Sequence, residues 1–451
     1  MNITKSKIMI LLVMLIILLS TSCTLKTDIE QKNKLVAEEK NEETPLSVET
    51  EIVNKENYEF NTIENTYISL DKMGGRLIGT DANYLFAKEL KIYMNKNFEN
   101  ADLIIQPYKI NLTKQYKVNI STDSDIITFN NENSICKYIN KSKLSENNLV
   151  VTNTLKNIKS EFNYIFFTDD ESLIEASKNY DNISISLLTV DKIFLGQNAI
   201  KVKTEIPTIM NIDNNIRNKL LKLVDKRVDL NINIENEEME LENVFAVVKG
   251  SESKNAIVIT SHYDSTTAKG DNYSKGAIDN GSGISLNLDL LRKVYNDTKN
   301  SYYDLIFAFV NSEEGFLLKS TSGSMQLDNL LAKNYENVLN INLDCLGEKN
   351  CEILNYGIDG NINVEELNHI ILTKVNDKVK LERVDYYISD NISFENSIYF
   401  YNFDYHGENR AIHTEKDNLD SIDINALEKI SNIIYEILVQ LSNTDESIVF
   451  N

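Results

Sequence analysis

The amino-acid sequence predicts an α/β fold with three layers, in which helices flank a mostly parallel mixed sheet that carries an inserted β-rich domain. Strand-like apolar runs alternate with helical patterns over most of the chain, which favours a parallel sheet. Three of these runs, residues 256–260, 304–310 and 338–343, end next to a histidine or a carboxylate. Ligands of parallel α/β sheets bind outside the carboxyl ends of the strands, so we expect a site at this edge.

Length and composition indicate a globular protein of two or three domains. The 451 residues are 42% hydrophobic and 25% charged, which are ordinary values for a folded chain. The net charge of −22 argues against nucleic-acid binding, because phosphates would be repelled. The four cysteines, Cys23, Cys136, Cys345 and Cys351, have no paired spacing, and we expect the last three to be ordinary thiols.

The N-terminal segment has the features of an export signal. Lys5 and Lys7 precede an apolar run at 8–19, which is short for a membrane span, and small residues follow it. Residues 1–22 resemble a bacterial lipoprotein signal, although Ser20 stands where that pattern has an aliphatic residue.

The lipoprotein resemblance implies lipidation at Cys23 and anchoring on the outer face of the cell membrane. A secreted protein and an uncleaved membrane anchor are the alternatives. Residues 23–57 are rich in Lys, Glu, Asn and Thr without apolar periodicity, so we interpret them as a solvated tether.

Folded sequence begins near Tyr58, and we divide it into a main domain, residues 58–110 plus 236–443, an insert at 111–235, and a tail at 444–451. The first domain segment contains a turn at 74–80, a helix with Phe86, Leu90, Tyr93 and Met94 on one face, and a strand at 103–110. In the insert we expect strands at 149–151, 164–167 and 183–188 and a helix at 214–224.

The second segment of the main domain resumes with a strand at 243–248 and continues through the three strands named above. We then expect a strand at 352–356, a helix at 364–375 and a strand at 397–403. Asp423 is a plausible N-cap for a final helix, whose apolar stripe repeats at helical spacing up to Leu441.

Five residues near the strand ends form a candidate ligand set for metal ions. Zinc sites combine histidine nitrogens with carboxylate oxygens from separate segments, and a pair of metals needs a bridging carboxylate. These residues are His262, Asp279, Glu314, Asp344 and His413.

Two further acids have expected roles beside this set. Asp264, two residues after His262, is placed to accept the second imidazole N–H. Glu313 is adjacent to a ligand and points elsewhere, so it is the candidate general base. No other cofactor-binding motif is found, since the glycines at 276, 281 and 283 lack the Lys-Ser/Thr of a phosphate loop.

The other histidines are poorer ligand candidates. His406 lies in a polar loop and competes with His413, whose Ile-His-Thr-Glu-Lys-Asp context favours it. His369 lies in a helical pattern and is interpreted as a surface or packing residue. The sequence contains neither His-Glu-x-x-His nor Gly-x-Ser-x-Gly, which excludes the helical zinc-peptidase motif and the serine nucleophile elbow.

The ordered motifs His-x-Asp, Gly-x-x-Asp-Asn-x-Ser-Gly, Glu-Glu, Asn-x-Asp-x-x-Gly and Ile-His-Thr-x-x-Asp resemble the co-catalytic di-zinc aminopeptidases of the aminopeptidase S and aminopeptidase Y kind. The similarity runs from about Tyr58 to Leu441 and includes Arg-Leu-Ile-Gly-Thr at 76–80. It implies a zinc-exopeptidase-like fold and, at 111–235, a protease-associated domain with a late strand near 206–207.

The resemblance also implies a division of ligands between two Zn²⁺ ions per chain. One ion would take His262 and Asp344, the other Glu314 and His413, and Asp279 would bridge them. Glu313 and Asp344 would also hold the α-amino group of a substrate.

The sequence departs from the family pattern in three places. Residues 316–320, Phe-Leu-Leu-Lys-Ser, replace both glycines that usually follow the glutamate pair. Asn391 stands where a helper histidine is common, and Ile412 stands where some members have an oxyanion-binding tyrosine.

We therefore expect an exported zinc aminopeptidase that shortens peptides from the N-terminus through a metal-bridging water, with Glu313 as general base. A carboxypeptidase or glutaminyl-cyclase-like enzyme of the same fold is one alternative. A non-catalytic surface protein on a peptidase scaffold is another, although such scaffolds usually lose a ligand.

Overall fold

The computed structural model describes residues 57–130, 133–156, 158–190, 201–202, 206–251, 254–266, 274–297, 301–314, 322–375, 379–403 and 411–450. The expected signal segment, the tether up to residue 56, Cys23, His406 and residues 316–320 lie outside this part of the chain. No helix in the described part is both long enough and apolar enough to span a membrane.

The strands form one continuous sheet, whose first part is mixed and has a parallel centre. Four central strands, β15, β12, β10 and β11, run parallel to one another, and antiparallel neighbours flank them on both sides. The fold class predicted from the sequence is therefore confirmed. In spatial order these strands are β14 (Lys380–Arg383), β13 (Ile353–Asp359), β15 (Ser397–Tyr401), β12 (Asn337–Leu343), β10 (Asn255–His262), β11 (Asp304–Val310), β9 (Arg227–Val248) and β1 (Asp102–Ser121).

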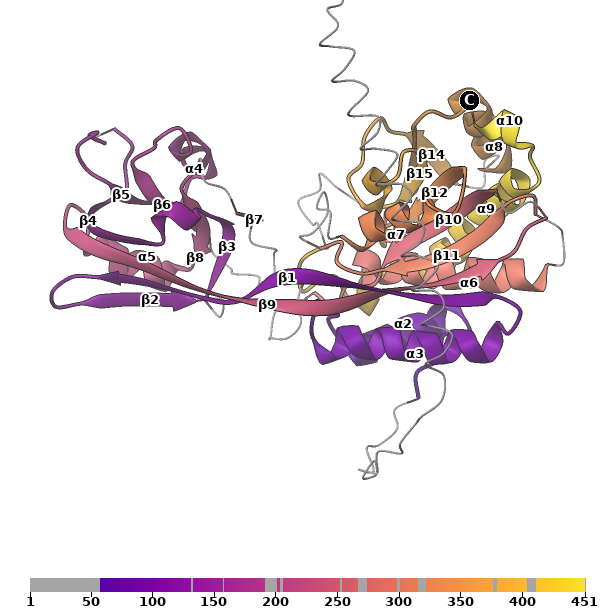
Figure 1. Ribbon diagram of the computed structural model, residues 1–451, viewed down its shortest axis with the longest axis horizontal. Helices are drawn as coiled ribbons and strands as arrows, with labels where there is room; N and C mark the ends of the chain where they lie inside the picture. Colours follow the sequence, from indigo (N-terminus) through magenta and orange to yellow (C-terminus); the bar gives the residue numbers. More distant parts are fainter. Residues whose placement is uncertain are drawn as a thin grey trace, which may run out of the picture. The chain divides into compact units, whose positions relative to one another are not determined.

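Helices cover both faces of this sheet, which gives three layers (Figure 1). Alternate residues of β10 face different layers, so Ile257 and Ile259 belong to the larger core and Val258 to the smaller one. The helix α7 (Gly323–Leu331) packs on the smaller core. The larger core is built with α2 (Ile63–Met73), α3 (Asp81–Asn97), α6 (Ser282–Asn296), α8 (Val364–Val375), α9 (Ile424–Ser442) and α10 (Glu446–Val449).

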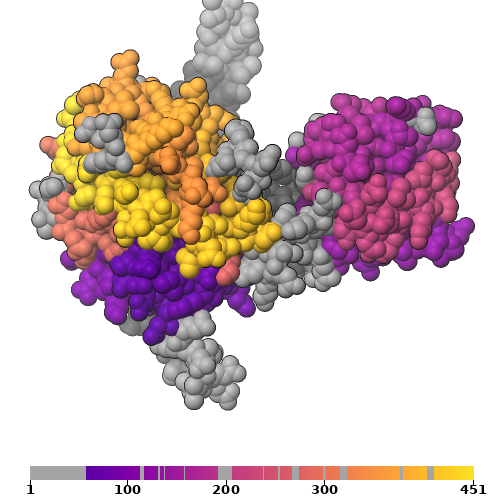
Figure 2. All heavy atoms as spheres, turned by 180° about the vertical axis from the view of Figure 1, so that it is seen from behind, coloured from indigo at the N-terminus to yellow at the C-terminus, as the bar shows by residue number. Residues whose placement is uncertain are grey.

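The chain ends of this unit share one surface. Residues of α2 and α3, in indigo, lie beside the C-terminal segment, in yellow (Figure 2).

The helix α9 begins after the expected N-cap Asp423, whose carboxylate accepts the Ala426 N–H at 3.0 Å. The helix expected at 364–375 is confirmed as α8.

A long two-stranded ribbon connects the first part of the sheet to the second. β1 and β9 pair antiparallel from Asp102 opposite Val247 to Ser121 opposite Asp229. The strand expected at 103–110 is therefore longer, because apolar residues continue to alternate with polar ones beyond it. The expected domain boundaries near 111 and 235 fall inside these strands, and the division into domains stays a prediction.

The second part of the sheet has its own cores, built from residues between Tyr116 and Ile234. The strands expected at 149–151, 164–167 and 183–188 lie in β4, β5 and β6. The expected helix is shorter, since the chain turns back at Asp225 (φ 61°) into β9. The elements of this second part are β2 (Ile126–Asn130), β3 (Ser134–Ile139), β4 (Ser145–Thr152), β5 (Tyr164–Thr168), α4 (Glu171–Ser177), β6 (Ile183–Thr189), β7 (Lys201–Val202), β8 (Thr208–Ile212) and α5 (Asn214–Leu221).

Gly357 of β13 provides a test of the packing in the first part of the sheet. It pairs with Tyr399 of β15, and a Cβ at this position would lie 2.1 Å from the tyrosine ring. We expect Gly357→Ala to lower the free energy of unfolding by about 1–3 kcal/mol, as overpacked sites do. Denaturant titration would measure it, and Tyr399→Val should recover part of the loss. An unchanged midpoint for Gly357→Ala would contradict this packing.

Candidate metal centre

Three neighbouring strands deliver candidate ligands to one edge of the sheet. His262 is the last residue of β10 and pairs with Val310, the last residue of β11, which lies three residues before Glu313. Asp344 directly follows β12. Because β10, β11 and β12 are parallel, these side chains meet beyond the carboxyl ends of the strands, where the sequence predicted a site.

Asp279 lies between two histidines at the centre of the site. Its Oδ1 is 3.2 Å from His262 Nε2, and its Oδ2 is 2.8 Å from His413 Nε2. Asp344 Oδ1 lies 3.5 Å from His262 Nε2, and Glu314 Oε1 lies 3.6 Å from His413 Nε2. Each oxygen of Asp279 therefore faces a different group of potential ligands.

The ligand atoms form two groups that share Asp279. The first group is His262, Asp279 and Asp344, the second is Asp279, Glu314 and His413, and the atoms within each lie within 4.8 Å of one another. This grouping matches the division that the family resemblance implies. The roles of these residues as ligands stay a prediction.

Three buried polar atoms in these groups have no hydrogen-bond partner among the described residues: His262 Nε2, Glu314 Oε1 and Asp344 Oδ1. Burying such atoms without a partner is costly, and a bound cation would offset that cost. Two histidine nitrogens with three carboxylates are also a donor set that zinc prefers. The residues present therefore fit a pair of divalent cations.

Burial of the acids at this edge gives the site unusual electrostatics. Burial, and next the charge of Asp279, raise the pKa of Glu314 to about 7. Burial also raises the pKa of Glu313 well above its usual range, although His262 opposes this shift. Burial raises the pKa of Asp279 as well, but its electrostatic interactions with His262 and His413 outweigh burial and hold the pKa below its usual range.

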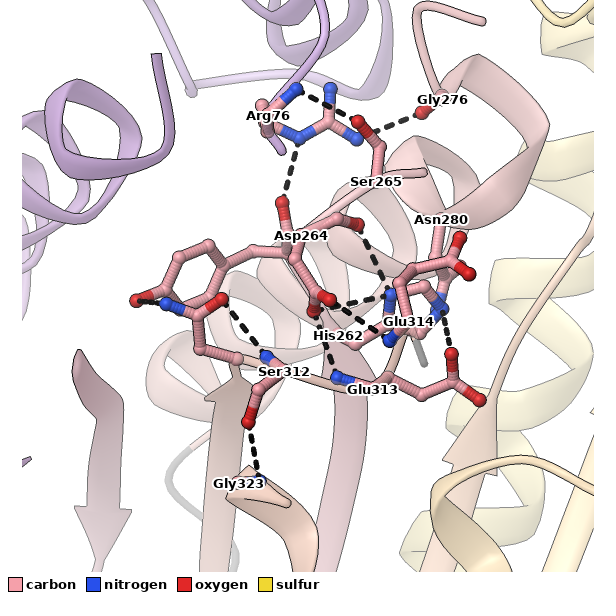
Figure 3. A network of polar contacts seen from close by, with 12 residues as sticks. Arg76, His262, Asp264, Ser265, Gly276, Asn280, Ser312, Glu313, Glu314 and Gly323 are labelled. Atoms are coloured by element: carbon pink, nitrogen blue, oxygen red, sulfur yellow. Dashed lines mark hydrogen bonds and ion pairs between the residues drawn. The ribbon is translucent and has the colours of Figure 1, made fainter. Parts of the chain in front are cut away.

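Asp264 contacts both His262 and the backbone of the glutamate pair. The His262 Nδ1 lies 3.2 Å from the backbone carbonyl of Asp264 and 3.6 Å from its carboxylate. The carboxylate instead accepts the backbone N–H groups of Glu313, at 3.1 Å, and Glu314, at 2.9 Å (Figure 3). Since a carbonyl can only accept, Nδ1 carries a proton, and Nε2 is the ring nitrogen that faces the other candidate ligands.

The glutamate pair divides between two positions. Glu314 belongs to the second ligand group, whereas Glu313 belongs to neither. The Glu313 side chain is 12% exposed, and its Oε2 lies 4.0 Å from His262 Nε2. Its carboxylate therefore lies beside the ligand groups, and its role as a base stays a prediction.

Backbone strain is concentrated next to the ligands. Ser312, Cys345 and His413 have positive φ angles of 61°, 51° and 61°, although none of them is a glycine. Such conformations cost roughly 1–3 kcal/mol each and persist only where the surroundings enforce them. The strain lies one residue before Glu313, one residue after Asp344 and at His413, where side chains must turn into the site.

Three residues that support the site were not assigned a role from the sequence. Tyr387 donates its hydroxyl to Asp344 Oδ2 at 3.0 Å. Asp417 accepts the Ile278 N–H at 2.6 Å, and Arg76 donates to carbonyls in two site loops. Arg76 and Asp417 both stand in quoted motifs, which was a usable signal, but nothing in the sequence pointed to Tyr387.

The family departures have structural explanations where the chain is described. Asn391 accepts the Ser389 N–H and donates to the Tyr387 carbonyl, so it shapes the loop that carries Tyr387. Ile412 is 4% exposed and packs in the larger core, so it contributes no polar group.

One family model matches the part of the chain that carries the site. Residues 243–438 match the model of Peptidase family M28. No curated protein sequence matches the chain.

Several solved structures share the fold. BSAP, a zinc aminopeptidase from Bacillus subtilis, is 17% identical with a TM-score of 0.64, and the match covers 88% of this chain and 99% of that one. An aminopeptidase from Aneurinibacillus sp. strain AM-1 is 16% identical (TM-score 0.59, coverage 87% and 96%). A peptidase M28 precursor from Shewanella amazonensis SB2B is 15% identical (TM-score 0.55, coverage 86% and 93%).

These likenesses extend across the main domain and beyond it, and at this identity they establish the fold. The family match covers all five candidate ligands within a single segment. The segment of this chain that carries the metal-ligand candidates is thus similar to Peptidase family M28.

Proposed function

We propose that this chain is an exported zinc aminopeptidase that releases N-terminal residues from peptides. The observation that carries the proposal is the pair of ligand groups that share Asp279, with the Glu313 carboxylate beside them. The fold likeness to BSAP, described as a zinc aminopeptidase, supports the same activity.

The charge of the site favours a free amino terminus over a C-terminal carboxylate. Four acids, Asp279, Glu313, Glu314 and Asp344, meet here, and their ion pairs among the described residues are with His262 and His413. No described lysine or arginine pairs with any of them. Bound zinc ions would neutralise the acids of the two ligand groups, whereas Glu313 belongs to neither group, so its carboxylate is left to attract a substrate ammonium group.

When bound to the two ligand groups, zinc ions would supply an activated water and polarise the scissile carbonyl. Glu313 accepts the proton of the attacking water and returns it to the leaving amine. Asp264 fixes the backbone of Glu313, so the carboxylate stays within reach of the reacting groups. Asp344 provides a second negative charge for the substrate ammonium group.

Removing the metal should abolish activity in a way that identifies the reaction. We expect about two Zn²⁺ per chain and hydrolysis of aminoacyl-anilides, which is lost with a chelator and restored by Zn²⁺. N-acetylated substrates should resist cleavage, because they lack the ammonium group. Cleavage of N-acetylated peptides from the C-terminus would indicate the carboxypeptidase alternative, and cyclisation of N-terminal glutamine would indicate the cyclase. A folded chain that binds no zinc would contradict the enzyme proposal.

Substitutions in the glutamate pair should have different effects. Glu313→Gln should keep both metals and lower kcat about a hundred- to ten-thousand-fold, roughly 3–5 kcal/mol of transition-state stabilisation. Glu314→Gln should weaken one zinc, because a neutral amide is a poorer ligand. Metal analysis and steady-state kinetics measure both effects, with exposed Glu428→Gln as control. If metal loss follows the Glu313 substitution instead, the two roles are exchanged.

We also propose that the protein is held on the outer face of the membrane by a lipid at Cys23. The sequence before it, with two lysines and an apolar run, supports this proposal. Mass spectrometry of the native protein should find a lipidated Cys23 as the first residue, and Cys23→Ser should move activity from the membrane to the soluble fraction. An intact Met1 in the native protein would rule the lipid anchor out.

A further inference from the structure

Arg76 stands outside the segment that matches the peptidase family, yet it is fully buried beside the candidate metal centre. It follows α2 in the chain and precedes α3. A buried arginine needs partners for its charge and for its five N–H donors. Where those donors point therefore indicates what the side chain does.

The guanidinium group binds the two loops that carry the central ligands (Figure 3). Nε donates to the Tyr263 carbonyl at 2.8 Å, directly after His262. Nη2 donates to the Gly276 carbonyl at 2.8 Å and Nη1 to the Lys275 carbonyl at 3.1 Å, a few residues before Asp279. One rigid group thus fixes the distance between the loop of His262 and the loop of Asp279.

The backbone of Arg76 is itself held in place. Its N–H donates to Ser265 Oγ at 2.8 Å, and its carbonyl accepts the Ser265 N–H at 3.2 Å. The Asn83 side chain of α3 donates to the same carbonyl at 3.0 Å. Because both ends of the residue are fixed, the guanidinium group can act as a spacer between the loops.

The fit against the second loop leaves no room for adjustment. Gly276 has φ 64°, and a Cβ there would lie 2.7 Å from Ser265 Cβ and 3.0 Å from Arg76 Nη2. The guanidinium plane therefore packs directly on the backbone of the loop. Lysine could keep the charge, but its ammonium group lacks the planar fork that reaches three carbonyls at once.

The donors of Arg76 are directed at carbonyls, and among the described residues its guanidinium group forms no ion pair with a carboxylate. Its charge still faces the acids Asp264, Asp279 and Asp417. A buried cation at this place offsets part of their repulsion and does so without competing for the ligand oxygens.

We infer that Arg76 is a positioning residue of the metal centre, which sets the spacing of His262 and Asp279 and hence the zinc affinity of both ligand groups. The inference rests on the proposed function, since it takes these groups to bind zinc. Both groups contain Asp279, so both should weaken when the loops separate.

Zinc binding by the full-length protein tests this inference. The zinc dissociation constant should rise about 10–100-fold in Arg76→Met, the range seen when groups that orient metal ligands are removed, and less in Arg76→Lys. The visible spectrum of the Co²⁺-loaded protein should change as well, because the ligand geometry changes. Arg292→Met is the control, since Arg292 of α6 is 15% exposed and bonds to Phe60 and Asp289 away from the site.

The outcomes separate this inference from the proposed function. Wild-type protein that binds no zinc contradicts the proposed function and the inference together. Wild-type binding with unchanged affinity and Co²⁺ spectrum in folded Arg76→Met contradicts the inference alone. If Arg76→Met does not fold, Arg76→Lys decides by the same measurements. Unfolding of both variants while Arg292→Met stays folded would assign Arg76 to general stability and overturn the positioning role.

Discussion

The structure depends on the cost of gathering carboxylates at the buried edge of a parallel sheet. Four acids meet where β10, β11 and β12 end, and their mutual repulsion must be offset by cations or hydrogen-bond donors. The two histidines, the neighbouring backbone N–H groups and a buried arginine offset part of it. Glu314 Oε1 and Asp344 Oδ1 have no hydrogen-bond partner among the described residues, and bound cations would complete the compensation there.

Much of the fold and the ligand set could be predicted from the sequence, because both leave local patterns. The strands that end at His262 and before Asp344 are apolar runs, and the ligands follow them at once. Because these strands are parallel, their carboxyl ends lie at the same edge of the sheet, independently of the conformation of the connecting loops. The ends of β1 and β9 were harder to predict from the sequence. A strand in a two-stranded ribbon has the same alternating pattern of apolar and polar residues as a strand inside a larger sheet.

The roles of the supporting residues could not be predicted to the same degree. Spacing placed Asp264 near His262, but which of its oxygens faces the ring depends on the turn between them. Tyr387 reaches Asp344 through a loop whose path no local pattern encodes. A contact between two chosen atoms depends on tertiary placement to within a few tenths of an ångström, and sequence periodicity has no such resolution.

Asp264 also shows how neighbouring identical residues acquire different roles. Its two carboxylate oxygens each hold one backbone N–H of the glutamate pair, so a single anchor orients both residues. Glu314 nevertheless belongs to a ligand group, whereas Glu313 lies beside it. The anchor is in turn tied to Arg76 through Ser265. The contacts around the site therefore include the turn before α3 as well as the segment that matches the family model, although about 160 residues separate them in the chain.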